Sequence, residues 1–290
     1  MESTAATEGP RANMFNIPPL RNYKLHNPPL VQALAQVRFP VIAKLASLEG
    51  VAGLQDALRE FFPYMDGITE NELSVDLASD NVTREKTTSW HFTDNTGTLL
   101  SVNTNSATLS MGTQYLSAES FISTFVRSLT IIQKELAILR CDRVGVRFLD
   151  VVNDSGSPEA SWKTWFKPEV VGWPGSDLIK PETHVASSIT QSQLVHKPIG
   201  DFANFASSVN AVVRHGVAES GAIVPGIPPY PLPTRSFILD LDFYVASQQP
   251  FDVNEISDQV RSLHSHIDRF FRWTLTEAGE KEFRLEEVEA

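Results

Sequence analysis

The tripeptide Val-Arg-Phe occurs twice in this chain, at residues 37–39 and 146–148. Side chains of a strand alternate between its two faces, so in each copy the valine and the phenylalanine share one face and the arginine takes the other. Each copy also precedes a similar order of predicted elements. The repeat therefore predicts a duplicated fold in which Arg38 and Arg147 lie on the sheet face opposite the core.

The first half of the chain reads as strand, helix, four strands and long helix. Residues 31–39 alternate as a half-buried strand, and apolar residues at helical spacing follow over 48–62. Residues 72–111 are rich in Thr, Ser, Asn and Val, which is typical of about four antiparallel strands joined by tight turns. Apolar residues every three or four positions over 121–139 then predict a long helix.

The second half repeats this order less regularly. Residues 144–152 predict a strand, and a Trp-rich segment over 162–173 takes the place of the short helix. Further strands are expected over 185–195 and 209–215. Five prolines within residues 225–233 favour an extended polyproline-like loop over a regular element.

The clearest alternation follows that loop, over residues 237–245, and separates an apolar face from a face that carries Asp240 and Asp242. A helix over 253–275 closes the half. We expect its apolar stripe on the concave or inner side of the sheet; the stripe consists of Ile256, Val260, Leu263, Ile267 and Phe270.

These patterns predict an α+β fold in which two β-α-β4-α units form one curved antiparallel sheet covered by two long helices. We divide the chain into a flexible N-terminal arm (1–26), a first α+β lobe (27–142) and a second α+β lobe (143–290). The predicted curved sheet with its two helices resembles the TATA-binding-protein-like and helix-grip arrangements in shape. This analogy implies no function.

The charge balance limits the classes of partner. With 24 basic and 35 acidic side chains the formal net charge is -11, which opposes non-specific binding to nucleic acid or anionic membranes. No apolar run is long enough for a signal peptide or a spanning helix, so we expect a cytoplasmic protein. The single cysteine, Cys141, is interpreted as a structural thiol.

Two segments carry a family resemblance: NPPLVQALAQVRFP at residues 27–40 and LHSHIDRFFRWTLTEAG at residues 263–279. Together they resemble the two ends of a family of uncharacterised proteins that occurs sporadically in bacteria and archaea. The family offers no catalytic residues to transfer. Its patchy occurrence is that of mobile defence or toxin-antitoxin loci, so the resemblance implies an antitoxin or antiphage-defence component.

No common nucleotide, hydrolase or zinc signature occurs in the sequence, so we expect no catalytic residue, no metal site and no cofactor. Asp240 and Asp242 share one strand face and could hold Mg²⁺ or act as acid and base. The alternative is that they pair across strands with Arg38 and Arg147, which explains all four residues without catalysis.

Aromatic residues and prolines outside regular elements are the other candidates for recognition, because they form grooves with little entropy lost on binding. The alternative is that the tryptophans fill the seam between the lobes. The candidate partner-binding residues are Arg38, Arg147, Asp240, Asp242, Trp162, Trp165 and Tyr230.

The sequence thus favours a non-enzymatic protein that binds a protein or peptide partner, and leaves a homo-oligomer open. The alternative is a sensor or enzyme that holds a small apolar or nucleotide-like ligand in a cavity between sheet and helices.

Overall fold

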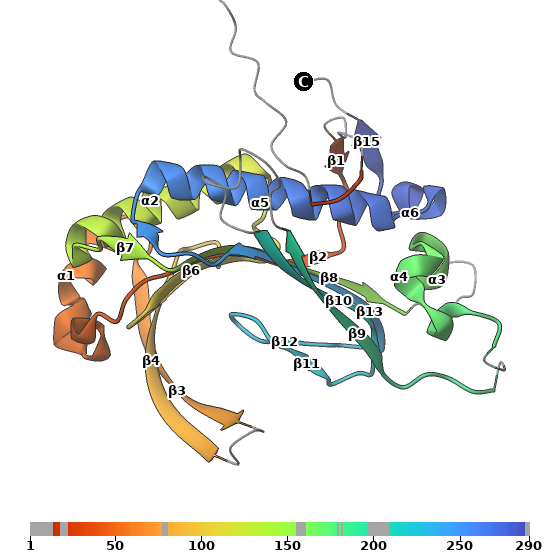
Figure 1. Cartoon of the computed structure of the whole chain (residues 1–290), viewed down its shortest axis with the longest axis horizontal. Helices are drawn as coiled ribbons and strands as arrows, with labels where there is room; N and C mark the ends of the chain where they lie inside the picture. The colour runs from red at the N-terminus through yellow and green to blue at the C-terminus, as the bar shows by residue number, and fades with distance from the viewer. Residues whose placement is uncertain are drawn as a thin grey trace, which may run out of the picture.

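The computed structural model describes residues 14–17, 23–76, 81–154, 161–178, 180, 182–196 and 209–287 (Figure 1). The first half follows the predicted order of strand, helix, four strands and long helix. Its elements are β2 (Leu30–Arg38), η1 (Ala43–Ala46), α1 (Leu48–Leu58), β3 (Tyr64–Asp76), β4 (Asn81–Thr93), β5 (Leu99–Asn103), β6 (Ser106–Met111) and α2 (Ala118–Leu136).

The second half begins with the strand that contains the second Val-Arg-Phe copy. Its elements are β8 (Arg143–Asn153), α3 (Trp162–Trp165), α4 (Pro168–Val171), η2 (Trp173–Gly175), β9 (Ser188–His196), β10 (Val209–Ala218), β11 (Ile223–Val224), β12 (Tyr230–Pro231), β13 (Ser236–Val245) and α5 (Val253–Thr274). Short elements complete the chain: β1 (Tyr23–Leu25), β7 (Arg140–Cys141), β14 (Gln249–Pro250), α6 (Glu277–Glu282) and β15 (Leu285–Glu287).

Among the described residues, nine strands form one antiparallel sheet in the order β3-β4-β5-β6-β2-β8-β13-β10-β9. The two Val-Arg-Phe strands, β2 and β8, are neighbours at its centre. On each side of this pair, the neighbouring strand is the last strand of its own half: β6 lies beside β2, and β13 lies beside β8. A duplication predicts this mirrored order. In the described part of the second half, three strands of the sheet follow the short helices where the prediction has four. The duplication itself stays a prediction.

The two long helices, α2 and α5, cover the convex face of the sheet, and the opposite face is concave (Figure 1). The predicted stripe of α5 packs inward, since Ile256, Leu263 and Ile267 are each 1% exposed. The prediction of a concave side is wrong, because both ends of the sheet bend away from the helices. The concave face is therefore not covered by α2 or α5.

One hydrophobic core joins the two halves of the chain. It includes Val37 of β2 and Val146 of β8, together with buried residues of α1, α2 and α5. The predicted boundary between the two lobes, at residues 142 and 143, therefore separates strands that belong to one continuous sheet. Cys141 is buried at this junction and forms no disulfide.

The N-terminal arm is not free along its whole length. Tyr23–Leu25 forms strand β1, which pairs with β15. The ring of Phe15 packs against Phe243 and Phe270, with centroids 6.0 and 5.1 Å apart. The prediction of a flexible arm over 1–26 is wrong for these residues, because their apolar rings and backbone groups find partners on the helix side. Residues 1–13 and 18–22 lie outside the described residues.

Candidate functional site

The concave face of the sheet carries a cluster of charged side chains on its central strands. On β13 the odd residues point to the helices and are buried, whereas Asp240 and Asp242 point to the concave face, as the alternation predicts. The neighbouring strands β2, β8 and β10 bring arginines to the same face. We call these residues the arginine cluster: Arg38, Arg143, Arg147, Arg214, Asp240 and Asp242.

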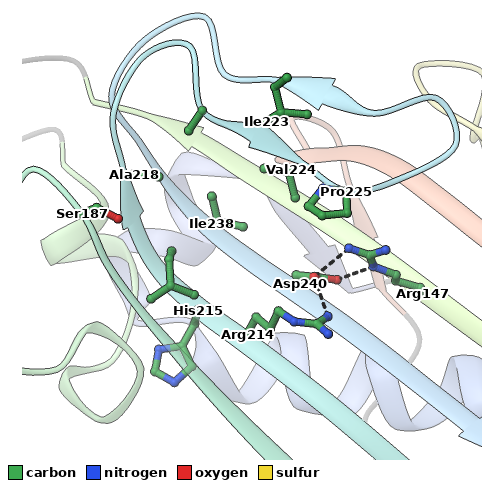
Figure 2. A pocket seen from close by; sticks show the side chains of 12 residues that line it. Arg147, Ser187, Arg214, His215, Ala218, Ile223, Val224, Pro225, Ile238 and Asp240 are labelled. Atoms are coloured by element: carbon green, nitrogen blue, oxygen red, sulfur yellow. Dashed lines mark hydrogen bonds and ion pairs between the residues drawn. The ribbon is translucent and has the colours of Figure 1, made fainter. Parts of the chain in front are cut away.

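Two arginines bind Asp240. Arg147 donates from Nε and Nη2 to the two carboxylate oxygens of Asp240 at 2.7 and 2.8 Å, and Arg214 donates from Nη1 at 3.1 Å (Figure 2). Asp240 is 1% exposed, so the desolvation of its charge is offset by this double pairing. Although burial opposes it, bonding to Asp240 raises the pKa of Arg147.

Asp242 is held by an arginine outside the set of candidate residues. Arg143 donates from Nη2 to both oxygens of Asp242, at 3.0 and 3.2 Å, and its guanidinium lies 4.3 Å from the ring centroid of Tyr244. Gly145 makes this position possible, because a Cβ there would lie 2.5 Å from Nη1 of Arg143. The Arg143 guanidinium is therefore fixed against the sheet on two sides.

Arg38 is the exposed member of the arginine cluster. It lies directly opposite Arg143 in the β2–β8 register, and its Nε donates to Oε1 of Gln36 at 3.1 Å. The same oxygen accepts a hydrogen bond from Nη1 of Arg143 at 3.1 Å. Among the described residues, Arg38 has no carboxylate partner. The expected pairing of the two aspartates with Arg38 and Arg147 is thus confirmed for Arg147 and wrong for Arg38, because Arg143 is the arginine that pairs with Asp242.

A flap formed by residues 219–235 folds over part of the concave face (Figure 1). The flap contains strands β11 and β12, which pair with each other. It buries a second hydrophobic cluster that consists of Leu149, Val151, Ala218, Val224, Leu232 and Ile238, with Val31, Ala222 and Tyr230 packed against it. Gln32 anchors the flap by donating to the carbonyl oxygen of Pro228 at 2.9 Å. The prediction of a loop without regular structure over residues 225–233 is wrong for β12, whereas β11 precedes that range.

The aromatic candidates lie apart from the arginine cluster. Trp162 is fully buried and stacks on Phe237 with ring centroids 5.2 Å apart, and Trp165 is 9% exposed. Their place in the core excludes them from a surface groove in this conformation, so their prediction as partner-binding residues is corrected. Tyr230 packs in the flap instead. The aromatic rings that these two tryptophans contact, Phe237 and Phe283, belong to the second half, so the contacts do not place them in the expected seam between the lobes.

Sequence reasoning missed Arg143 and Arg214. Arg143 has the same parity as Arg147 on β8, a signal that was available in the sequence. Arg214 lies opposite Asp240 in the register of β10 and β13, which only the strand order reveals.

Polar side chains also meet on the helix side of the sheet. Tyr23 donates from its hydroxyl to Asp268 at 2.6 Å, and the Tyr115 hydroxyl lies 3.0 Å from Nε2 of His264. Burial lowers the pKa of His264, and the charges of Asp268 and Glu119 oppose this effect. Buried apolar side chains of the core also lie between the sheet and the helices. The cavity described below lies on the concave face, on the opposite side of the sheet from the place expected for a sensor or enzyme.

No protein-family model matches this chain, and neither does any curated protein. Within the described ranges, no three His, Cys, Asp or Glu side chains are grouped so that they could hold a metal ion. No helix in the described part combines the length and apolar character needed to cross a membrane.

Proposed function

We propose that this protein is a non-enzymatic binding module that recognises an acidic segment of a protein partner on its concave sheet face. The position of Arg38 carries the proposal. Arg38 is exposed, lies directly opposite a second arginine, and has no carboxylate partner among the described residues. Like charges directly opposite each other destabilise a strand pair. A bound carboxylate would relieve that repulsion.

The other arginines support the same use of the face. Asp240 and Asp242 hold Arg143, Arg147 and Arg214 in fixed positions, so little side-chain entropy is lost when a partner binds. Among the described residues, the arginine cluster contains four arginines and two aspartates, an excess of two positive charges in a chain of net charge -11. Such a local excess favours an acidic ligand.

A protein segment fits this charge pattern better than a nucleic acid does. The negative field of the whole chain repels a long polyanion, whereas a short acidic segment meets chiefly the local positive charge. Together with the family resemblance of residues 27–40 and 263–279, this supports a cytoplasmic antitoxin or antiphage-defence component whose partner is another protein.

Site-specific photo-crosslinking in cells of the source organism tests this function. A benzoylphenylalanine at Gln193, an exposed residue of β9 on the arginine side of the sheet, reports contacts of the concave face. The same probe at the exposed Thr130 of α2 is the matched control on the helix side. We expect cross-linked peptides rich in Asp and Glu from Gln193 only. Cross-links to nucleic acid, or the same peptides from both positions, would contradict the proposal.

A further inference from the structure

The concave face holds a cavity of ≈ 380 Å³ beneath the flap. Its wall is largely apolar and includes Ile189, Ala222, Ile223, Val224, Pro225 and Ile238, while Ser187, His215 and Ala218 also line the cavity. Its floor is charged, because Arg147, Arg214 and Asp240 all line it. Figure 2 shows the two guanidinium groups converging on Asp240, with the flap residues Val224 and Pro225 nearby. An apolar wall beside a few fixed polar groups is the usual composition of a small-ligand site.

The floor has one excess positive charge, because two arginines and one aspartate line it. Asp240 accepts from Nε and Nη2 of Arg147 and from Nη1 of Arg214, and Gln191 accepts from Nε of Arg214 at 2.7 Å. Among the described residues, Nη1 of Arg147 and Nη2 of Arg214 have no hydrogen-bond partner. These N–H groups remain available to a ligand.

From this arrangement we infer that the cavity binds an aliphatic carboxylate. A single carboxylate matches the single excess charge, and its two oxygens accept hydrogen bonds from guanidinium N–H groups with good geometry. The aliphatic part of the ligand would cover the isoleucine and valine side chains of the wall. The ligand is either a free organic acid or the C-terminal residue of a peptide with an apolar side chain. Arg38, which carries the proposed function, does not line this cavity, so the two proposals are separable.

A ligand-observed NMR titration with hexanoate, hexanol and hexylamine tests the inference. The three compounds share one chain length and differ in charge. We expect hexanoate to bind in about the millimolar range that is typical of small ligands, and hexanol and hexylamine to bind at least about tenfold more weakly. Equal affinity for hexanoate and hexanol, or tighter binding of hexylamine, would overturn the inference.

Two variants locate the binding. R214Q removes a donor from the floor, and I223D places a negative charge at a rim residue that is 67% exposed, where we expect a polar group to cost little stability. We expect each to weaken hexanoate binding about tenfold. R261Q, which removes an exposed ion pair on α5, is the matched control and should bind hexanoate as the wild type does. Wild-type affinity in both R214Q and I223D would refute the site.

The source of the carboxylate follows from a second pair of probes, N-acetylleucine and N-acetylleucinamide. Tighter binding of N-acetylleucine than of both its amide and hexanoate supports a peptide C-terminus. Tighter binding of hexanoate supports a free acid. R38Q should leave hexanoate binding unchanged, so failure of the proposed protein partner and failure of this cavity give different results.

Discussion

Arg38 and Arg143 face each other across the central strand pair β2–β8, and both donate to the single side-chain oxygen Oε1 of Gln36. Burial lowers the pKa of Arg143, Asp242 opposes this effect, and the charge of Arg38 adds to it. Arg143 is stabilised by Asp242 and Tyr244, whereas Arg38 gains little from the fold. The position of Arg38 therefore supports the proposed role in binding rather than a role in stability.

Arg38→Ala should leave the free energy of unfolding within about 1 kcal/mol of the wild type, or raise it slightly, because it removes a like-charge contact and no ion pair. Urea denaturation at low and high salt measures this. A large loss of stability would show that Arg38 supports the fold. It would remove the main observation in favour of a recognition surface on the concave face.

Arg147→Ala should destabilise the protein by about 3 kcal/mol, because it leaves the buried Asp240 with Arg214 alone. The repeat in the sequence places Arg38 and Arg147 in equivalent positions, but only Arg147 pairs with a buried carboxylate. Arg261→Ala, which removes an exposed pair with Glu119, is the control and should cost less than about 1 kcal/mol. Equal denaturation midpoints for the two variants would contradict the burial of the Asp240 pair.

Asp150 gives the protein a pH-dependent stability. Burial, with a smaller contribution from the charge of Asp240, raises the pKa of Asp150 to about 8. Between its unfolded pKa of about 4 and this value, the folded state binds one more proton than the unfolded state. Stability from this group is therefore present at low pH and is lost as pH rises toward 8, with a slope of at most about 1.4 kcal/mol per pH unit.

Asp150→Asn should flatten that slope and stabilise the protein near pH 8. Denaturation midpoints between pH 5 and 8 measure both effects, with the exposed Asp56→Asn as control. The same slope in wild type and Asp150→Asn would assign the pH dependence to another group.

Ile267→Ala should lower the free energy of unfolding by roughly 2 to 5 kcal/mol, since this side chain of α5 is 1% exposed in the core and its removal leaves a cavity. Calorimetric unfolding of Ile267→Ala beside Arg38→Ala compares the two faces of the sheet directly. A cost below about 1 kcal/mol for Ile267→Ala would place this residue outside the packed core.

The fold could be predicted from the sequence where local periodicity determines it. The alternation around Asp240 gave both the strand and the face of each side chain, and the spacing from Ile256 to Ile267 gave the buried stripe of α5. Neither pattern depends on which elements lie side by side.

The site could be predicted only in part, because it depends on contacts between distant segments. The partner of Asp240 in β10, Arg214, follows from strand order. The proline-rich flap has no periodicity that would indicate which face it covers. Trp162 belongs to a residue type that serves cores and interfaces alike, so its burial required the packing around Phe237.

Fluorescence anisotropy with a labelled oligoglutamate peptide measures whether the arginine cluster binds an acidic protein segment, as we propose. The net charge of -11 makes general attraction of this peptide unfavourable, so binding reports the local cluster. We predict saturable binding to the wild type, about tenfold weaker binding to Arg38→Gln, and unchanged binding to Arg261→Gln. Equal affinities for the wild type and Arg38→Gln, or tighter binding of a labelled single-stranded oligonucleotide than of the peptide, would contradict the claim.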